Sequence, residues 1–187
     1  MRNTYIFEVL ETFTPGETEA FRQFLASPYF NNGFNAEKHQ MLFQLWMENR
    51  QPSTPDTLSR EQVYAVLFPH SPGVEGKLDK LVSEFKKLLQ TFLLVQRYLG
   101  AENQSARLLH LAMDMRSRGL EEKYGQAFQK AQKTADAAET ESMDGYLFRY
   151  QLALEAHEWN STYNKAKGDL NIPEVLFYLD QYYFAQR

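Results

Sequence analysis

The chain has 187 residues, of which 43% are hydrophobic and 14% aromatic, and this composition excludes general disorder. The formal net charge is only −4 and is spread over both halves, so neither half has the strong positive field of a protein held mainly by phosphates. The chain contains no cysteine, which excludes disulfides, thiolate metal sites and cysteine nucleophiles.

The sequence favours a cytoplasmic location. The N-terminal segment carries Glu8 and Glu11 and lacks the apolar run of a signal peptide. Uninterrupted apolar runs are only a few residues long, far short of the ~20 residues that a membrane span needs. We therefore expect a soluble protein in a reducing compartment, with no membrane partner.

The first part of the chain has the pattern of short helices. Apolar residues at helical spacing predict a helix over residues 4–12. Thr14 followed by Glu17 is typical of a capping box, and a second helix is expected to follow it as far as Ala26. Pro28 ends this helix, because the residue before a proline is pushed out of helical geometry.

Two further helices are predicted before the middle of the chain. One covers residues 36–49, with Asn35 as its cap. The proline-containing stretch 51–57 is expected to be a loop. Ser59 with Gln62 then forms a second capping box and opens a short fourth helix.

The central helix is predicted from Lys77 to Leu99. Its apolar residues recur at alternating steps of three and four, which keeps one helix face apolar. These residues are Leu78, Leu81, Phe85, Leu88, Phe92, Val95 and Leu99. Gly100 follows directly, where a left-handed C-terminal cap is expected. Residues 1–100 are therefore expected to form a helical bundle around this helix.

Shorter helices are predicted in residues 101–187, which we expect to form a second domain. They cover residues 105–118, 121–138, 141–159 and 172 to the end. The stretch 165–170 is polar and loop-like, and Asn171 is expected to cap the last helix. An apolar row is expected on the third of these helices: Met143, Leu147, Tyr150, Leu154 and His157. No segment alternates with a period of two, so the predicted fold class is all-α.

Seven residues between 104 and 138 fall at the spacing of a packed helix pair: Leu108, Leu111, Ala112, Met115, Tyr124, Phe128 and Ala131. This spacing resembles a tetratricopeptide repeat, in degenerate form because Leu108 stands where Trp is typical. The resemblance implies a helical-hairpin array that reaches the end of the chain and binds other proteins. An ordinary antiparallel helix pair is the alternative explanation of the same spacing.

Three strings in the first half are FRQFLASPYFNN, LSREQVYAVLFP and LDKLVSEFKKLLQTFLL. They resemble the opening of a group of bacterial all-helical proteins in which such a module precedes tetratricopeptide-like hairpins. The resemblance implies that this chain is the front of a longer one. The group has no agreed biochemical activity, so the resemblance implies none for this chain. A repeat array normally ends in a polar capping helix, so the aromatic last helix also favours a truncated chain or an intermolecular contact.

A short capped helix, a Leu-Phe-Pro stop and a helix rich in Leu and Lys follow one another over residues 58–93. This order resembles the winged-helix part of some bacterial transcription regulators. The resemblance implies a recognition helix with four lysines near DNA: Lys77, Lys80, Lys86 and Lys87. Acidic residues interleave with these lysines and no wing strands follow. A nucleic-acid-binding regulator is therefore the alternative function, and we do not expect nucleic acid to be the partner.

No motif for catalysis or metal binding is found in the sequence. The four histidines are not spaced to place a metal pair on one helix face: His39, His70, His110 and His157. There is no glycine-rich phosphate loop and no nucleophile elbow. We expect no catalytic residue, no cofactor and no metal, and hence no enzyme. His157 is expected to be partly buried and hydrogen-bonded.

Aromatic residues near the end of the chain are the candidate partner-binding site: Tyr178, Tyr182, Tyr183 and Phe184. One interpretation is that they pack against a neighbouring helix. The other is that they anchor a protein partner, because Tyr and Phe provide large contact areas at low entropic cost. The expected function is a non-catalytic protein–protein interaction or scaffold module, whose partner the sequence does not name.

Overall fold

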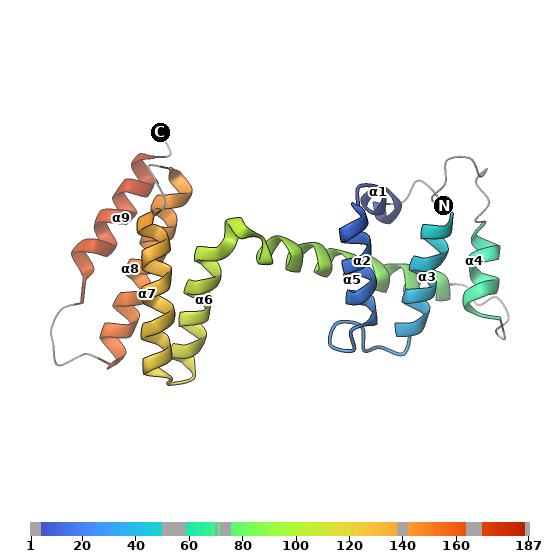
Figure 1. Cartoon of the computed structure of the whole chain (residues 1–187), viewed down its shortest axis with the longest axis horizontal. Helices are drawn as coiled ribbons and strands as arrows, with labels where there is room; N and C mark the ends of the chain where they lie inside the picture. The colour runs from blue at the N-terminus through green and yellow to red at the C-terminus, as the bar shows by residue number, and fades with distance from the viewer. Residues whose placement is uncertain are drawn as a thin grey trace. The chain divides into compact units, whose positions relative to one another are not determined.

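The computed structural model describes residues 5–49, 59–69, 71, 76–137, 142–163 and 170–185. Every regular element in these ranges is a helix, which confirms the all-α fold class (Figure 1). The loop predicted at 51–57 lies outside the described residues, as does all but the last residue of the loop at 165–170. Contacts divide the chain into two compact units, Met1–Gln96 and Arg97–Arg187.

The helices of the first unit begin where the sequence signals predict. They are α1 (Tyr5–Glu11), α2 (Pro15–Ala26), α3 (Ala36–Glu48), α4 (Arg60–Leu67) and α5 (Lys77–Leu99), the last of which ends in the second unit. Both capping boxes are confirmed. The Thr14 hydroxyl accepts from the Glu17 amide at 3.2 Å, and the Ser59 hydroxyl accepts from the Gln62 amide at 3.2 Å.

The structure differs from the predictions at two helix ends, at Asn35 before α3 and at Gly100 after α5. Asn35 precedes α3 but makes no side-chain cap bond, because its amide donates to the carboxylate of Glu84 in α5 at 2.8 Å. A charged acceptor of this kind makes the stronger hydrogen bond. The prediction of a left-handed Gly100 is wrong. Gly100 has φ −56°, its N–H donates to the Arg97 carbonyl, and the chain runs on into the short 3₁₀ helix η1 (Ala101–Asn103).

Helix α5 provides the largest share of the first unit's core. Its buried residues are Leu78, Leu81, Phe85, Leu89 and Phe92. Phe21 of α2 lies among the rings of this core, with centroid distances of 5.1 Å to Phe43, 5.7 Å to Phe85 and 5.0 Å to Phe92. Leu99, predicted on the apolar seam, is 59% exposed because the core of this unit ends at Phe92.

The second unit is built from helical hairpins. Its elements after η1 are α6 (Gln104–Ser117), α7 (Glu121–Ala137), α8 (Met143–Tyr163) and α9 (Ile172–Phe184). Helix α6 packs along α7 and α8 packs along α9, while α8 also contacts both α6 and α7. The turn between α6 and α7 needs a left-handed residue, and Gly119 provides it with φ 70°. The Leu120 amide then donates to the Met115 carbonyl, which completes a Schellman motif.

The apolar row predicted on α8 is confirmed only in part, because Leu147, Tyr150 and His157 are half-buried. The residues of α8 that the structure buries are Gly145, Leu152, Ala153 and Glu155. Met143 and Leu154, which belong to the predicted row, are exposed. Apolar residues are distributed all around this helix, so the pattern alone could not identify the side that packs.

Candidate interaction surface

Polar contacts at the start of α9 hold it against α8. The side-chain amide of Asn171 donates to the Ala153 carbonyl of α8 at 3.0 Å. Asn171 has a left-handed φ of 43° and makes no side-chain cap bond, so the predicted cap serves as a link between helices. One residue earlier, the Leu170 carbonyl accepts from Nδ1 of His157 at 2.6 Å. His157 is therefore half-buried and hydrogen-bonded, as predicted.

The residues of α9 divide into two sides. The side that packs on α8 is half-buried and comprises Val175, Tyr178, Leu179, Gln181 and Tyr182. The opposite side is exposed, and we call it the outer face of α9: Ile172, Leu176, Phe177, Asp180, Tyr183 and Phe184. Helix α9 has no fully buried residue. A helix that is apolar on both sides is normally covered on both sides.

The apolar side chains of the outer face are largely open to solvent. The exposed fractions are 54% for Leu176, 56% for Phe177, 60% for Tyr183 and 66% for Phe184. Single exposed apolar residues are ordinary, whereas a contiguous group on one helix side is a candidate interaction surface.

The structure divides the four predicted partner-binding residues. Tyr183 and Phe184 lie on the outer face, whereas Tyr178 and Tyr182 lie on the side that packs on α8. Sequence reasoning missed Leu176 and Phe177. Their spacing from Tyr183 and Phe184, seven residues each, is a helical repeat that could have revealed them.

The hairpin that carries α9 is anchored by a buried ion pair. Nε of Arg116 in α6 lies 2.7 Å from Oε1 of Glu155 in α8, and Nη2 lies 3.0 Å from Oε2. Glu155 is 4% exposed, and its hydrogen bonds raise the pKa of Arg116. Nearby, the Tyr124 ring stacks on Trp159 with centroids 3.9 Å apart, and burial raises the pKa of Tyr124. These contacts fix α8 on the preceding hairpin.

The four lysines of the nucleic-acid alternative lie at exposed positions of α5. Lys77 donates to Ser71 at 2.7 Å, Lys80 lies 4.0 Å from Glu84, and Lys86 lies over the Tyr5 ring at 4.7 Å. The intervening Asp79 pairs with Arg60 of α4 at 2.6 Å. The exposed side of α5 therefore carries both signs of charge, and nucleic-acid binding stays a prediction.

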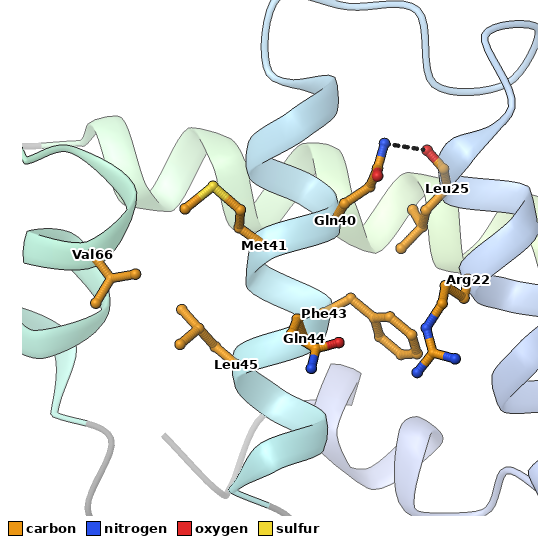
Figure 2. A pocket seen from close by; sticks show the side chains of 8 residues that line it. All are labelled: Arg22, Leu25, Gln40, Met41, Phe43, Gln44, Leu45 and Val66. Carbon is orange, nitrogen blue, oxygen red and sulfur yellow. Dashed lines mark hydrogen bonds between the residues drawn. The ribbon is translucent and has the colours of Figure 1, made fainter.

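The first unit has a separate surface groove of about 380 Å³ (Figure 2). It is lined by Arg22, Leu25, Gln40, Met41, Phe43, Gln44, Leu45 and Val66. Met41 and Leu45 point from α3 toward Val66 of α4, and the Gln40 amide donates to the Leu25 carbonyl of α2. Most of the lining side chains are apolar, and the polar ones are Arg22, Gln40 and Gln44.

Within the described ranges, no group of three or more His, Asp or Glu side chains is placed to hold a metal ion. His39 is buried, His110 stacks on Tyr98, and His70 lies outside the described residues. None of the described helices is long and apolar enough to cross a bilayer. Comparison with known protein families, with curated proteins and with solved structures finds no match for this chain.

Proposed function

We propose that this protein is a non-catalytic interaction module that binds a protein partner through the outer face of α9. The observation that carries the proposal is the combination of an apolar inner side packed on α8 and an equally apolar outer face left uncovered. Apolar area removed from water contributes about 25 cal/mol per Å², and aromatic residues are the usual anchors of interfaces.

The order of packing supports a degenerate tetratricopeptide-like array for α6 to α9. In such an array each hairpin packs its first helix against both helices of the preceding hairpin. Helix α8 does this with α6 and α7. The interaction would then occur on the α8–α9 hairpin, where the outer face of α9 is apolar and exposed.

A substitution in the centre of the outer face tests this proposal. Phe177→Asp adds a charge that any covering partner would have to desolvate, so partner binding should fall at least tenfold, which corresponds to about 1.4 kcal/mol. The matched control is Leu111→Asp, at an exposed leucine of α6.

The three proteins would be immobilised in parallel and incubated with extract of the source cells, and captured proteins would be quantified by mass spectrometry. Circular dichroism would check that both variants keep the helical fold. We expect at least one protein to be captured by the parent and by Leu111→Asp, and lost with Phe177→Asp. Equal capture by all three proteins would contradict the proposal.

A further inference from the structure

Asp180 lies at the centre of the outer face of α9. The residues three and four positions away on either side, which are its neighbours on the helix surface, are Leu176, Phe177, Tyr183 and Phe184. All four are apolar or aromatic and exposed or half-exposed. Helix α9 contains no Lys, Arg or His, and no hydrogen bond or ion pair joins Asp180 to another residue in the described part of the chain.

A partner that covers this face must also cover the Asp180 carboxylate. Removing an unpaired carboxylate from water is strongly unfavourable, whereas a carboxylate that meets a cation at hydrogen-bonding distance is tolerated. The partner must therefore bring a positive charge to the centre of its own apolar surface.

The shape of the face favours a helix as the occupant. It is one side of a helix of 13 residues, about 20 Å long, whose backbone groups are engaged along its length. A strand would find no open sheet edge here, whereas a second helix can pack its side chains between those spaced three and four residues apart.

Building on the proposed function, we propose that the partner presents an amphipathic helix whose apolar stripe carries a Lys or Arg at its middle, paired with Asp180. Charge also argues against a second copy of this chain as the occupant. Two copies related by a twofold axis through this face would place both Asp180 carboxylates together, and like charges in an interface are unfavourable.

Two designed peptides test the inference directly. Each is a fluorescein-labelled amphipathic helix of about 18 residues, long enough to cover α9, with a leucine stripe and a charge-balanced polar side. They differ at one position in the middle of the stripe, which is Arg in one peptide and Glu in the other. Fluorescence anisotropy would measure their affinity for the full chain and for the variants Asp180→Asn, Asp180→Arg and Phe177→Asp.

We expect the parent protein to bind the Arg peptide at least tenfold more tightly than the Glu peptide, a difference of the size that one ion pair at a buried interface gives. Asp180→Asn should remove most of this preference, and Asp180→Arg should reverse it. The matched control is Glu121→Arg, which makes the same change in net charge at an exposed site on α7 and should leave the preference unchanged.

The outcomes separate this inference from the proposed function. Suppose that Phe177→Asp abolishes binding of both peptides but Asp180→Arg leaves the preference for the Arg peptide unchanged. The outer face then binds helices, and the proposed Lys or Arg in the middle of the partner helix is wrong. If Phe177→Asp changes neither peptide binding nor partner capture, the proposed function itself is wrong. A dimer in sedimentation that Phe177→Asp dissociates and Asp180→Asn strengthens would assign the face to a second copy and overturn the inference.

Discussion

His39 is a buried histidine whose hydrogen bonds determine its tautomer. The side-chain amide of Asn31 donates to the carbonyls of Leu25 at 2.7 Å and Ala36 at 3.0 Å, so its oxygen is free to accept. Nδ1 of His39 lies 2.9 Å from that oxygen and must be the donor. Nε2 then carries a lone pair 3.6 Å from a Glu84 carboxylate oxygen and has no hydrogen-bond partner.

This arrangement predicts a pH dependence of stability. Burial lowers the pKa of His39, and the nearby charge of Glu84 opposes that shift only in part. In the unfolded chain His39 has the ordinary pKa of about 6.5, so below that pH the unfolded chain takes up a proton more readily than the folded one. The stability that neutral His39 contributes is therefore fully present above about pH 6.5 and is lost as the pH falls through the lower pKa of the folded state. The test is urea unfolding of the parent and His39→Gln at pH 7.5 and 5.5.

The parent should lose more stability between the two pH values than His39→Gln does. His110→Gln is the matched control, because His110 is exposed. His110→Gln should keep the greater loss of stability at pH 5.5 that the parent shows. Equal losses in the parent and in His39→Gln would show that His39 does not titrate differently in the folded and unfolded states.

At the scale of elements, the position of α8 depends on the Arg116–Glu155 pair. Apolar residues surround α8, so its pattern does not select one side for packing. A buried carboxylate with two hydrogen bonds to one guanidinium favours the side of α8 that brings Glu155 to Arg116. The pair therefore favours the orientation of α8 that buries Glu155 against α6.

Glu155→Gln tests this assignment. The substitution keeps the shape of the side chain and leaves the Arg116 charge without its partner. Because a quarter of the Arg116 side chain is exposed, the free energy of unfolding should fall by about 2 kcal/mol, less than for a fully buried pair. Asp114→Asn is the control, since Asp114 pairs with Arg118 at the surface and its loss should change stability by less than about 1 kcal/mol. Urea unfolding followed by tryptophan fluorescence measures both. Equal effects of the two variants would show that the buried pair has no special role.

At the scale of the whole molecule, the two units have separate hydrophobic cores. The first core centres on Phe21, Phe85 and other residues of α1 to α5, and the second consists of smaller clusters around Ala131 and Tyr124. Each unit holds one of the chain's two tryptophans: Trp46 lies in the first core and Trp159 stacks in the second unit. Each tryptophan therefore reports on one unit.

The separate cores predict that a core substitution acts on one unit. Leu81→Ala removes a fully buried side chain of α5 and should destabilise the first unit by about 3 kcal/mol. We expect the urea midpoint to shift in the Trp159→Phe background, where Trp46 reports, and to stay unchanged in the Trp46→Phe background, where Trp159 reports. A common shift in both backgrounds would mean that the two units unfold as one.

The sequence by itself determined the elements whose signals are local. The bounds of α5 follow from an apolar pattern that no Gly or Pro interrupts, and the starts of α2 and α4 follow from capping boxes that need only four consecutive residues. These signals are reliable because each is satisfied within one turn or one face of a single helix. The all-α fold class follows from them.

Only the tertiary structure decided what depends on a distant partner. Asn35 bonds Glu84 and not its own helix, and Glu155 of α8 is buried because it pairs with Arg116 of α6. The candidate site follows the same division. Its aromatic content was visible in the sequence, but the separation of Tyr178 and Tyr182 from Tyr183 and Phe184 required the position of α8. A side chain's surroundings depend on residues far along the chain, and these become neighbours only on folding.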